Sequence, residues 1–171
     1  YWGRPLKSIL AVLDRKTINF KFHHIVSSNS TFIDKDFEDK IKFFKDFKSY
    51  KKYFQNNGTI LSQNKRKEII NREFKKILDK KKLTIENNPK LLEEVVDLVD
   101  NPNILLCSFN KKFLSIPKEI LILTMQSHQK YFPTFDQKKE VTNEFLIVAN
   151  KKDTRGSVSY THLTLPTKQD V

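Results

Sequence analysis

The sequence predicts an α+β domain in which antiparallel hairpins pack with three to four helices. Apolar residues recur at helical spacing in residues 62–81 and 89–99, and they alternate at strand spacing in residues 17–26. A short apolar run at residues 104–109 is typical of a buried strand. These helices and strands do not alternate regularly along the chain, so a parallel α/β sheet is not expected.

Two strands are predicted at residues 6–13 and 17–26, joined by a short polar turn into a β-hairpin. The adjacent His23 and His24 would lie on the second strand and point to opposite faces, so we do not expect them to bind one metal ion. Residues 27–45 show no clear period and give no assignment.

A short helix is predicted at residues 46–55, ended by Asn57-Gly58, a pair that favours a left-handed cap. Ser62 is then a suitable N-cap for a longer helix that ends near Lys81. The apolar residues of this longer helix fall at the spacing of a buried stripe: Ile70, Phe74, Ile77 and Leu78. Its other face is basic.

The next helix begins at Asn88-Pro89 and ends at Asn101-Pro102, with proline tolerated at the first helical position. The predicted inner face consists of Leu92, Val95, Val96 and Val99. The outer face carries Glu93, Glu94, Asp97 and Asp100. Because this acidic face would repel nucleic acid, we expect this helix to pack against the protein or a basic partner and not against phosphate.

After the strand at residues 104–109, a helix is predicted from Pro117 to about Ser127. Residues 131–136 and 144–150 then form two further strands. The helix is expected to place three residues near one another on one face: Leu121, Met125 and His128.

The formal net charge of the 171 residues is +12, and most of the basic residues are lysine. Such a surface attracts polyanions through counterion release, and RNA or DNA is the usual partner. A composition rich in Lys, Asn, Ile and Phe is also what an AT-rich coding genome produces whatever the function. Both explanations of the charge remain open at this point.

Several kinds of site lack support in the sequence. The three glycines, Gly3, Gly58 and Gly156, stand too far apart to build a phosphate-binding loop. Cys107 is the single cysteine, which rules out an internal disulfide and fits a reducing cytoplasm. No spacing indicates a catalytic triad or a metal site. No apolar run approaches the roughly 18 residues that span a bilayer, so no membrane contact is expected.

The corner between the last helix and the following strand, residues 125–133, is unusually polar. His128, Gln129 and Lys130 could line a groove and contact a phosphate, a ribose or a partner backbone. They could equally cap the end of the helix, where a histidine interacts favourably with the helix dipole.

Five segments in order resemble the β subunit of bacterial glycyl-tRNA synthetase. They are WGRPLKSILAVL at residues 2–13, LLEEVVDLVDNP at 91–102, FLSIPKE at 113–119, TMQSHQKYFP at 124–133 and FLIVAN at 145–150. The resemblance covers roughly residues 1–153, and its helix-to-strand block is specific because several unusual residue types recur in one order.

The resemblance implies an enzyme of two α and two β subunits that joins glycine to its tRNA with ATP and magnesium. The α subunit carries the chemistry, while the β subunit supplies tRNA binding and assembly. It also implies similarity of the fold to the tRNA-editing domain of phenylalanyl-tRNA synthetase. We therefore expect a cytoplasmic protein whose partners are the α subunit and glycine tRNA. The chain itself should hold no catalytic residue, cofactor or metal and should be inactive alone.

The sequence departs from the family pattern in two places. Where the family has a Gly-His-Arg-Phe segment, residues 29–34 read NSTFID. Residues 154–171 resemble translated sequencing adapter, so we expect a non-native tail after a partial N-terminal region of the β subunit at residues 1–153, truncated at both ends.

If the basic surface meets tRNA, two groups of residues are candidate contacts. The phosphate contacts would come from the long helix: Lys65, Arg66, Arg72, Lys75 and Lys76. The ordered contacts would come from the polar corner: His128, Gln129 and Lys130. Two alternatives are a general RNA-binding module, which would bind unrelated RNAs equally, and a tRNA-editing hydrolase, which would deacylate mischarged tRNA.

Overall fold

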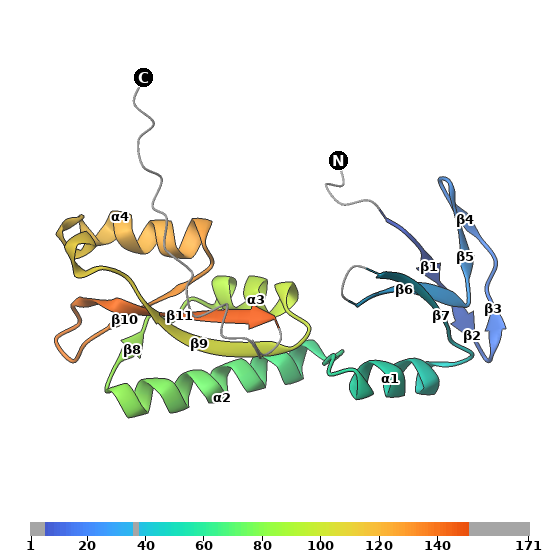
Figure 1. Cartoon of the computed structure of the whole chain (residues 1–171), viewed down its shortest axis with the longest axis horizontal. Coiled ribbons are helices and arrows are strands. Elements are labelled where there is room, and N and C mark those ends of the chain that lie inside the picture. Colours follow the sequence, from blue (N-terminus) through green and yellow to red (C-terminus); the bar gives the residue numbers. More distant parts are fainter. Residues whose placement is uncertain (1–5, 36–37, 151–171) are drawn as a thin grey trace, which may run out of the picture. The chain divides into compact units, whose positions relative to one another are not determined.

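The computed structural model describes residues 6–35 and 38–150, and the predicted tail at residues 154–171 lies outside them. The described residues form an α+β structure, as predicted, that divides into two compact units, Tyr1–Leu61 and Ser62–Val171 (Figure 1). Among these residues no helix is both long and apolar enough to cross a membrane.

The elements of the first unit are β1 (Ile9–Leu10), β2 (Val12–Leu13), β3 (Lys16–Thr17), β4 (Lys21–Phe22), β5 (Ile25–Ser28), β6 (Ser30–Lys35), β7 (Glu38–Phe43) and α1 (Phe47–Asn56). Those of the second unit are α2 (Gln63–Lys81), β8 (Thr84–Ile85), α3 (Pro89–Leu98), β9 (Pro102–Ser108), a 3-10 helix (Lys111–Ser115), α4 (Lys118–Leu123), a π-helical turn (Thr124–His128), β10 (Phe132–Phe135) and β11 (Val141–Asn150).

The first unit is built from short strands. β2 and β3 form the predicted hairpin around Asp14 and Arg15, which both have the positive φ that suits a two-residue hairpin turn. β1 pairs in parallel with β5, and β4 pairs with β5 in the antiparallel sense. β6 and β7 form a further hairpin in the segment that the sequence left unassigned.

The prediction that His23 and His24 lie on a strand and point to opposite faces is wrong. They form the turn between β4 and β5, and His23 has a φ of 51°. Because both residues occupy this turn, the chain reverses in the middle of the expected strand. The segment with alternating apolar residues therefore contains two strands, β4 and β5, and the turn between them. Periodicity alone does not distinguish this arrangement from one continuous strand.

The last element of the first unit, α1, begins and ends as predicted. Asp46 caps its N-terminus by accepting a hydrogen bond from the Ser49 backbone N–H at 2.8 Å. Gly58, with a φ of 81°, follows the helix in the left-handed region. The inner side of α1 packs its aromatic rings around the buried Phe44.

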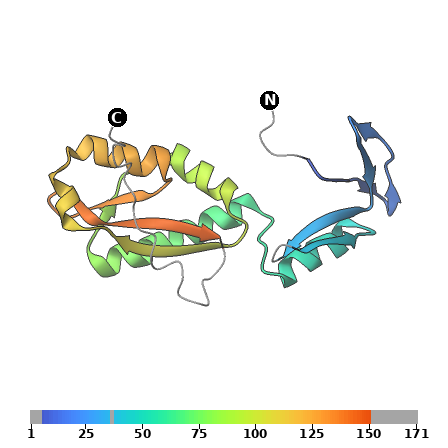
Figure 2. The same cartoon turned by 45° about the horizontal axis from the view of Figure 1, so that its top comes forward.

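The second unit centres on an antiparallel sheet in the order β8-β10-β11-β9. Both faces of β11 are covered by helices (Figure 2). Successive residues of a strand point to opposite faces, so neighbouring residues of β11 belong to two different cores. Leu146 faces the side on which α2 and α3 pack, whereas Phe145 and Ile147 face α4 and the π-helical turn. The sheet is therefore the middle layer of the second unit.

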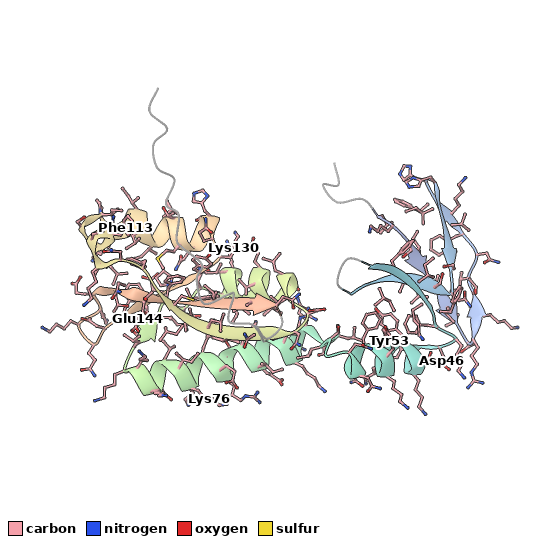
Figure 3. The ribbon with its side chains drawn as sticks, viewed as in Figure 1. Asp46, Tyr53, Lys76, Phe113, Lys130 and Glu144 are labelled. Atoms are coloured by element: carbon pink, nitrogen blue, oxygen red, sulfur yellow. The ribbon has the colours of Figure 1, made fainter. Side chains whose placement is uncertain are left out.

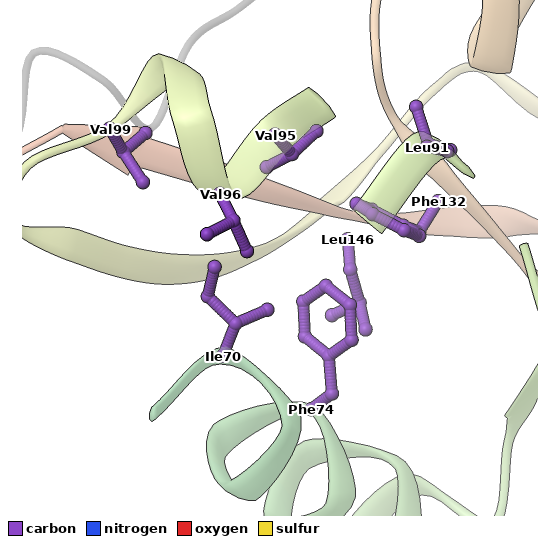
Figure 4. Packing of buried hydrophobic residues seen from close by; sticks show 8 residues of the cluster. All are labelled: Ile70, Phe74, Leu91, Val95, Val96, Val99, Phe132 and Leu146. Carbon is purple, nitrogen blue, oxygen red and sulfur yellow. The ribbon is translucent and has the colours of Figure 1, made fainter. Parts of the chain in front are cut away.

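The larger core lies between α2, α3 and the sheet (Figure 4). Ile70 and Phe74 of α2 meet Val96 of α3 and Leu146 of β11, and the Phe74 ring packs edge-on against Phe132 at 4.8 Å between centroids. The buried stripe predicted for the longer helix thus forms the centre of this core. The helix ends at Lys82, which adopts the left-handed conformation.

Candidate nucleic-acid interface

The outward face of α2 carries basic side chains opposite its buried stripe. Lys65, Arg72 and Lys76 lie seven and four residues apart, a spacing that brings side chains to one face of an α-helix. All three are exposed, as is the neighbouring Lys75. In Figure 3, Lys76 lies on the side of α2 that faces away from the sheet. The structure thus places four of the predicted phosphate contacts on one solvent-facing surface.

A carboxylate lies within this basic face. Glu73 accepts hydrogen bonds from Lys76 Nζ at 2.9 Å and from Arg72 Nε at 3.1 Å. The hydrogen bond from Lys76 and then that from Arg72 lower the pKa of Glu73 below its usual value. Both basic side chains remain more than 60% exposed, with 63% and 64% of their surface accessible. They can therefore contact an anion, but part of their charge is already balanced.

Arg66 lies on the inward side of α2 and not on the outward face. Only 13% of its side chain is exposed. Its Nε donates to the backbone carbonyl of Val96 at 3.0 Å, and its Nη2 lies 3.9 Å from Asp97 Oδ1. Arg66 therefore links α2 to α3 in this structure, although the sequence pattern grouped it with the phosphate contacts.

The acidic face of α3 meets basic groups of the same chain. Lys67 Nζ lies 3.5 Å from Glu93 Oε1, and Gln63 Nε2 donates to Asp97 Oδ1 at 2.6 Å. Glu93, Glu94 and Asp97 remain at least half exposed, so this face forms ion pairs at the surface and is not packed against the protein. Gln63 and Lys67 could not be predicted as partners of this face, because residues about 30 positions apart carry no local signal of pairing.

The polar corner does not gather its three candidates into one groove. His128 and Gln129 are exposed, while Lys130 has a φ of 58° and places Nζ 2.8 and 2.9 Å from the two carboxylate oxygens of Glu94. The contact made by Lys130 again joins α3 to a neighbouring segment. Of the three, His128 and Gln129 are exposed and Lys130 is partly buried.

The expectation that His128 shares a face with Leu121 and Met125 is wrong. Leu121 and Met125 are buried at 1% and 0% exposure, but His128 is exposed. The helix widens after Leu123 into a π-helical turn, whose i→i+5 bonds take more residues per turn. The wider turn rotates His128 away from the buried face.

A second basic surface, which the sequence analysis did not single out, lies on α1. Lys48, Lys51 and Lys52 are exposed and are spaced three and four residues apart. The signal was present in the sequence, because the segment from Phe47 to Asn56 contains these three lysines and no acidic residue. None of the ion pairs found among the described residues involves these lysines.

A cavity of about 300 Å³ lies in the first unit beside α1. Its wall is formed by Leu10, Val12, Phe44, Asp46, Phe47 and Tyr50. Three of these residues are aromatic, and Phe47 is 72% exposed. Within residues 6–35 and 38–150 no group of three or more His, Cys, Asp and Glu side chains could hold a metal ion.

The sequence matches the family model described as glycyl-tRNA synthetase beta subunit over residues 1–160. Curated relatives named glycine–tRNA ligase beta subunit come from Rickettsia akari, Rickettsia bellii and Rickettsia africae, and they are 36%, 37% and 35% identical to this chain. The alignments cover 87%, 87% and 92% of the chain but only 22%, 23% and 24% of these relatives. The chain thus spans less than a quarter of their length.

Proposed function

Because the chain belongs to the glycyl-tRNA synthetase beta subunit family, we propose that it is a part of a glycine–tRNA ligase that binds tRNA and takes part in subunit assembly. In this proposal a partner α subunit carries the ATP-dependent, magnesium-assisted attachment of glycine, and the protein works in the cytoplasm. The family match over most of the chain is the observation that carries the proposal.

The outward face of α2 supports the tRNA-binding part of the proposal. At a rise of about 1.5 Å per residue, Lys65, Arg72 and Lys76 spread along roughly 16 Å of the helix. A surface of this length can follow several phosphates of one RNA strand. Lysine acts here as a point charge and not as a fork, so this face would attract the backbone without reading its sequence.

The ion pairs of the second unit divide the candidate contacts into two groups. Lys65, Arg72, Lys75 and Lys76 stay in the proposed interface on α2. The exposed His128 and Gln129 lie at the end of the π-helical turn, which packs on the other face of the sheet, so they would form a separate contact. Arg66 and Lys130 contact carboxylates of α3, so in our proposal they position the helices and do not themselves contact phosphate.

The test is a pair of charge reversals in the whole chain, Lys65→Glu with Lys76→Glu, and glycine tRNA as the ligand. Each lost phosphate contact lowers the salt slope of binding by roughly 0.7 to 0.9, so we expect a decrease of about 1.5 together with weaker binding. Lys138→Glu with Lys139→Glu is the matched control, because both lysines are exposed in the β10–β11 turn and the change in net charge is equal.

An unchanged slope in the α2 variant, or an equal loss in the control, would reject the assignment of the interface to α2. Aminoacylation by the complete ligase, assembled with its α subunit, tests the function itself. We expect the double reversal to raise the KM for tRNA and to leave the KM for glycine unchanged. Equal binding of an unrelated RNA would indicate a general RNA-binding module instead.

A further inference from the structure

The lysine face of α1, formed by Lys48, Lys51 and Lys52, breaks the local electrostatic rules of helix formation. Like charges three and four residues apart destabilise a helix, and Lys48 lies in the first turn, where the helix dipole favours acidic residues. The Asp46 carboxylate at the N-cap offsets part of the dipole effect, but α1 itself contains no acidic residue that could pair with the three lysines. A local rule that is broken in this way is often found at a functional surface.

The basic residues of α2 are in a different situation. Arg72 and Lys76 share Glu73, and Lys67 pairs with Glu93 across the helix pair. The charge of α2 is therefore balanced at several points within the folded protein. The lysine face of α1 lacks such partners among the described residues, so an external anion would relieve its repulsion.

An exposed aromatic ring borders the lysine face. Phe47 is 72% exposed, and it lies four residues before Lys51 on the helix, so the two side chains are neighbours. Its ring stacks on Tyr50 at 6.4 Å between centroids and 22° between planes, and Tyr50 in turn contacts the buried Phe44. Phe47 is thus supported on one side and open on the other.

The cavity beside α1 lies next to this ring and suits a flat, largely apolar group. Its volume of about 300 Å³ is open to solvent on one side and is lined by Phe47, Tyr50 and Phe44 together with two aliphatic side chains. The carboxylate of Asp46 in the wall is already engaged, because it caps α1 and lies 3.7 Å from Arg15 Nε. Arg15 therefore offsets part of the repulsion of Asp46 toward a polyanion.

We infer that this part of the first unit binds an unpaired nucleotide of single-stranded RNA, with the base in the cavity against Phe47 and the flanking phosphates on Lys48, Lys51 and Lys52. Stacking requires a free base face, which a duplex does not offer, so the site selects single-stranded segments. The charge of the lysine face favours RNA over an apolar peptide as the occupant. This inference rests on the proposed function and adds a second contact with the same kind of ligand.

The test measures fluorescence anisotropy of the whole chain with a labelled single-stranded oligoadenylate of about ten nucleotides and with a duplex of the same length. Phe47→Ala should weaken binding of the single strand by about 5-fold to 150-fold, the range measured for one base stacked on an aromatic ring. It should leave the salt slope and duplex binding unchanged. Phe47→Trp should restore binding, whereas Phe47→Leu, which keeps an apolar side chain, should not.

The lysines are tested with Lys48→Gln and Lys51→Gln together, which should lower the salt slope for the single strand by about 1.4. Lys138→Gln with Lys139→Gln is the control of equal charge and should change neither affinity nor slope. Because Phe47 and the lysines are exposed, the variants should fold, and circular dichroism at 222 nm verifies that they do.

Each result decides between the two proposals. The inference is overturned if Phe47→Ala binds the single strand with wild-type affinity, or if it loses as much affinity for the duplex as for the single strand. The proposed function still stands in either case if the α2 reversals weaken tRNA binding. Loss of α-subunit binding by Phe47→Ala without any change for RNA also overturns it and identifies a protein interface. A chain that binds neither oligoadenylate nor tRNA contradicts both proposals.

Discussion

Replacing Arg66 by alanine separates a structural role of this residue from a role in RNA binding. Arg66 donates from Nε to the Val96 carbonyl at 3.0 Å and approaches Asp97 at 3.9 Å, and 13% of its side chain is exposed. The Arg66→Ala variant therefore removes a charged donor at the contact between α2 and α3. We expect the second unit to lose stability.

The magnitude follows from these two contacts. A hydrogen bond from a charged donor contributes about 1.5–3 kcal/mol. The ion pair adds at most about 0.5 kcal/mol, because Asp97 is 62% exposed and the distance is long. We expect a loss of about 2–3 kcal/mol in the free energy of unfolding. In urea denaturation followed by circular dichroism, this corresponds to a midpoint lowered by roughly 1 M for a slope near 2 kcal/mol/M.

Arg72→Ala is the matched control, because it removes the same side chain from the outward face of α2. Its side chain is 64% exposed and pairs with Glu73 on the same helix, so its loss should cost less than about 0.5 kcal/mol. If Arg66→Ala were as stable as the control and weakened tRNA binding as much as the Lys65 and Lys76 reversals do, the structural role of Arg66 would be refuted.

Three further predictions concern stability. Leu146→Ala should lower the free energy of unfolding by about 2–5 kcal/mol, because Leu146 is fully buried in the core of the second unit; a urea midpoint within error of the wild type would contradict this. Lys82→Gly should raise the Tm, with a gain of about 1 kcal/mol, because Lys82 holds a φ of 56° that glycine adopts without a steric penalty; a lowered Tm would count against it. The hydrogen bond from the Ser49 backbone, with smaller contributions from the Ser49 side chain and Arg15, lowers the pKa of Asp46 below 3.8. This cap therefore stabilises α1 fully above about pH 4, and the stabilisation is lost as the pH falls through the lowered folded pKa of Asp46. The chemical shift of the Ser49 amide in NMR should titrate with a midpoint below 3.8. A midpoint at or above this value would contradict the capping role.

The helices of the second unit could be predicted from the sequence because their signals are local. Ser62 and Asn88 cap α2 and α3, and each side chain accepts a hydrogen bond from the backbone N–H three residues on. The stripe of Ile70 and Phe74 follows the helical period, and both residues are buried. Caps and periodicity depend on neighbours within a few residues, so one sequence contains enough information to find them.

The strands of the first unit were harder to predict because most are two residues long. Their turns use Asp14, Arg15 and His23 at positive φ, where glycine or asparagine would have marked the reversal. Periodicity over two residues does not distinguish a strand from a turn, so the sequence indicated one hairpin where the structure has three.

The candidate interface was predictable to the extent that helical spacing determines it. The outward direction of Lys65, Arg72 and Lys76 follows from the buried stripe opposite them. The engagement of Arg66 and Lys130 does not follow from any local pattern, because their carboxylate partners lie on α3, about 30 positions away or more. The tertiary structure, and not the local sequence, determines which basic residues remain accessible to a ligand.

Lysine is so common in this chain that the position of the acidic residues, and not the number of basic ones, identifies the open basic surfaces. Arg66 is balanced by α3 and largely covered, and the outward face of α2 is balanced in part by Glu73. The lysine face of α1 has no acidic residue on its own helix. By the basic charge that is left open to an external anion, α1 therefore ranks first, the outward face of α2 second and Arg66 last.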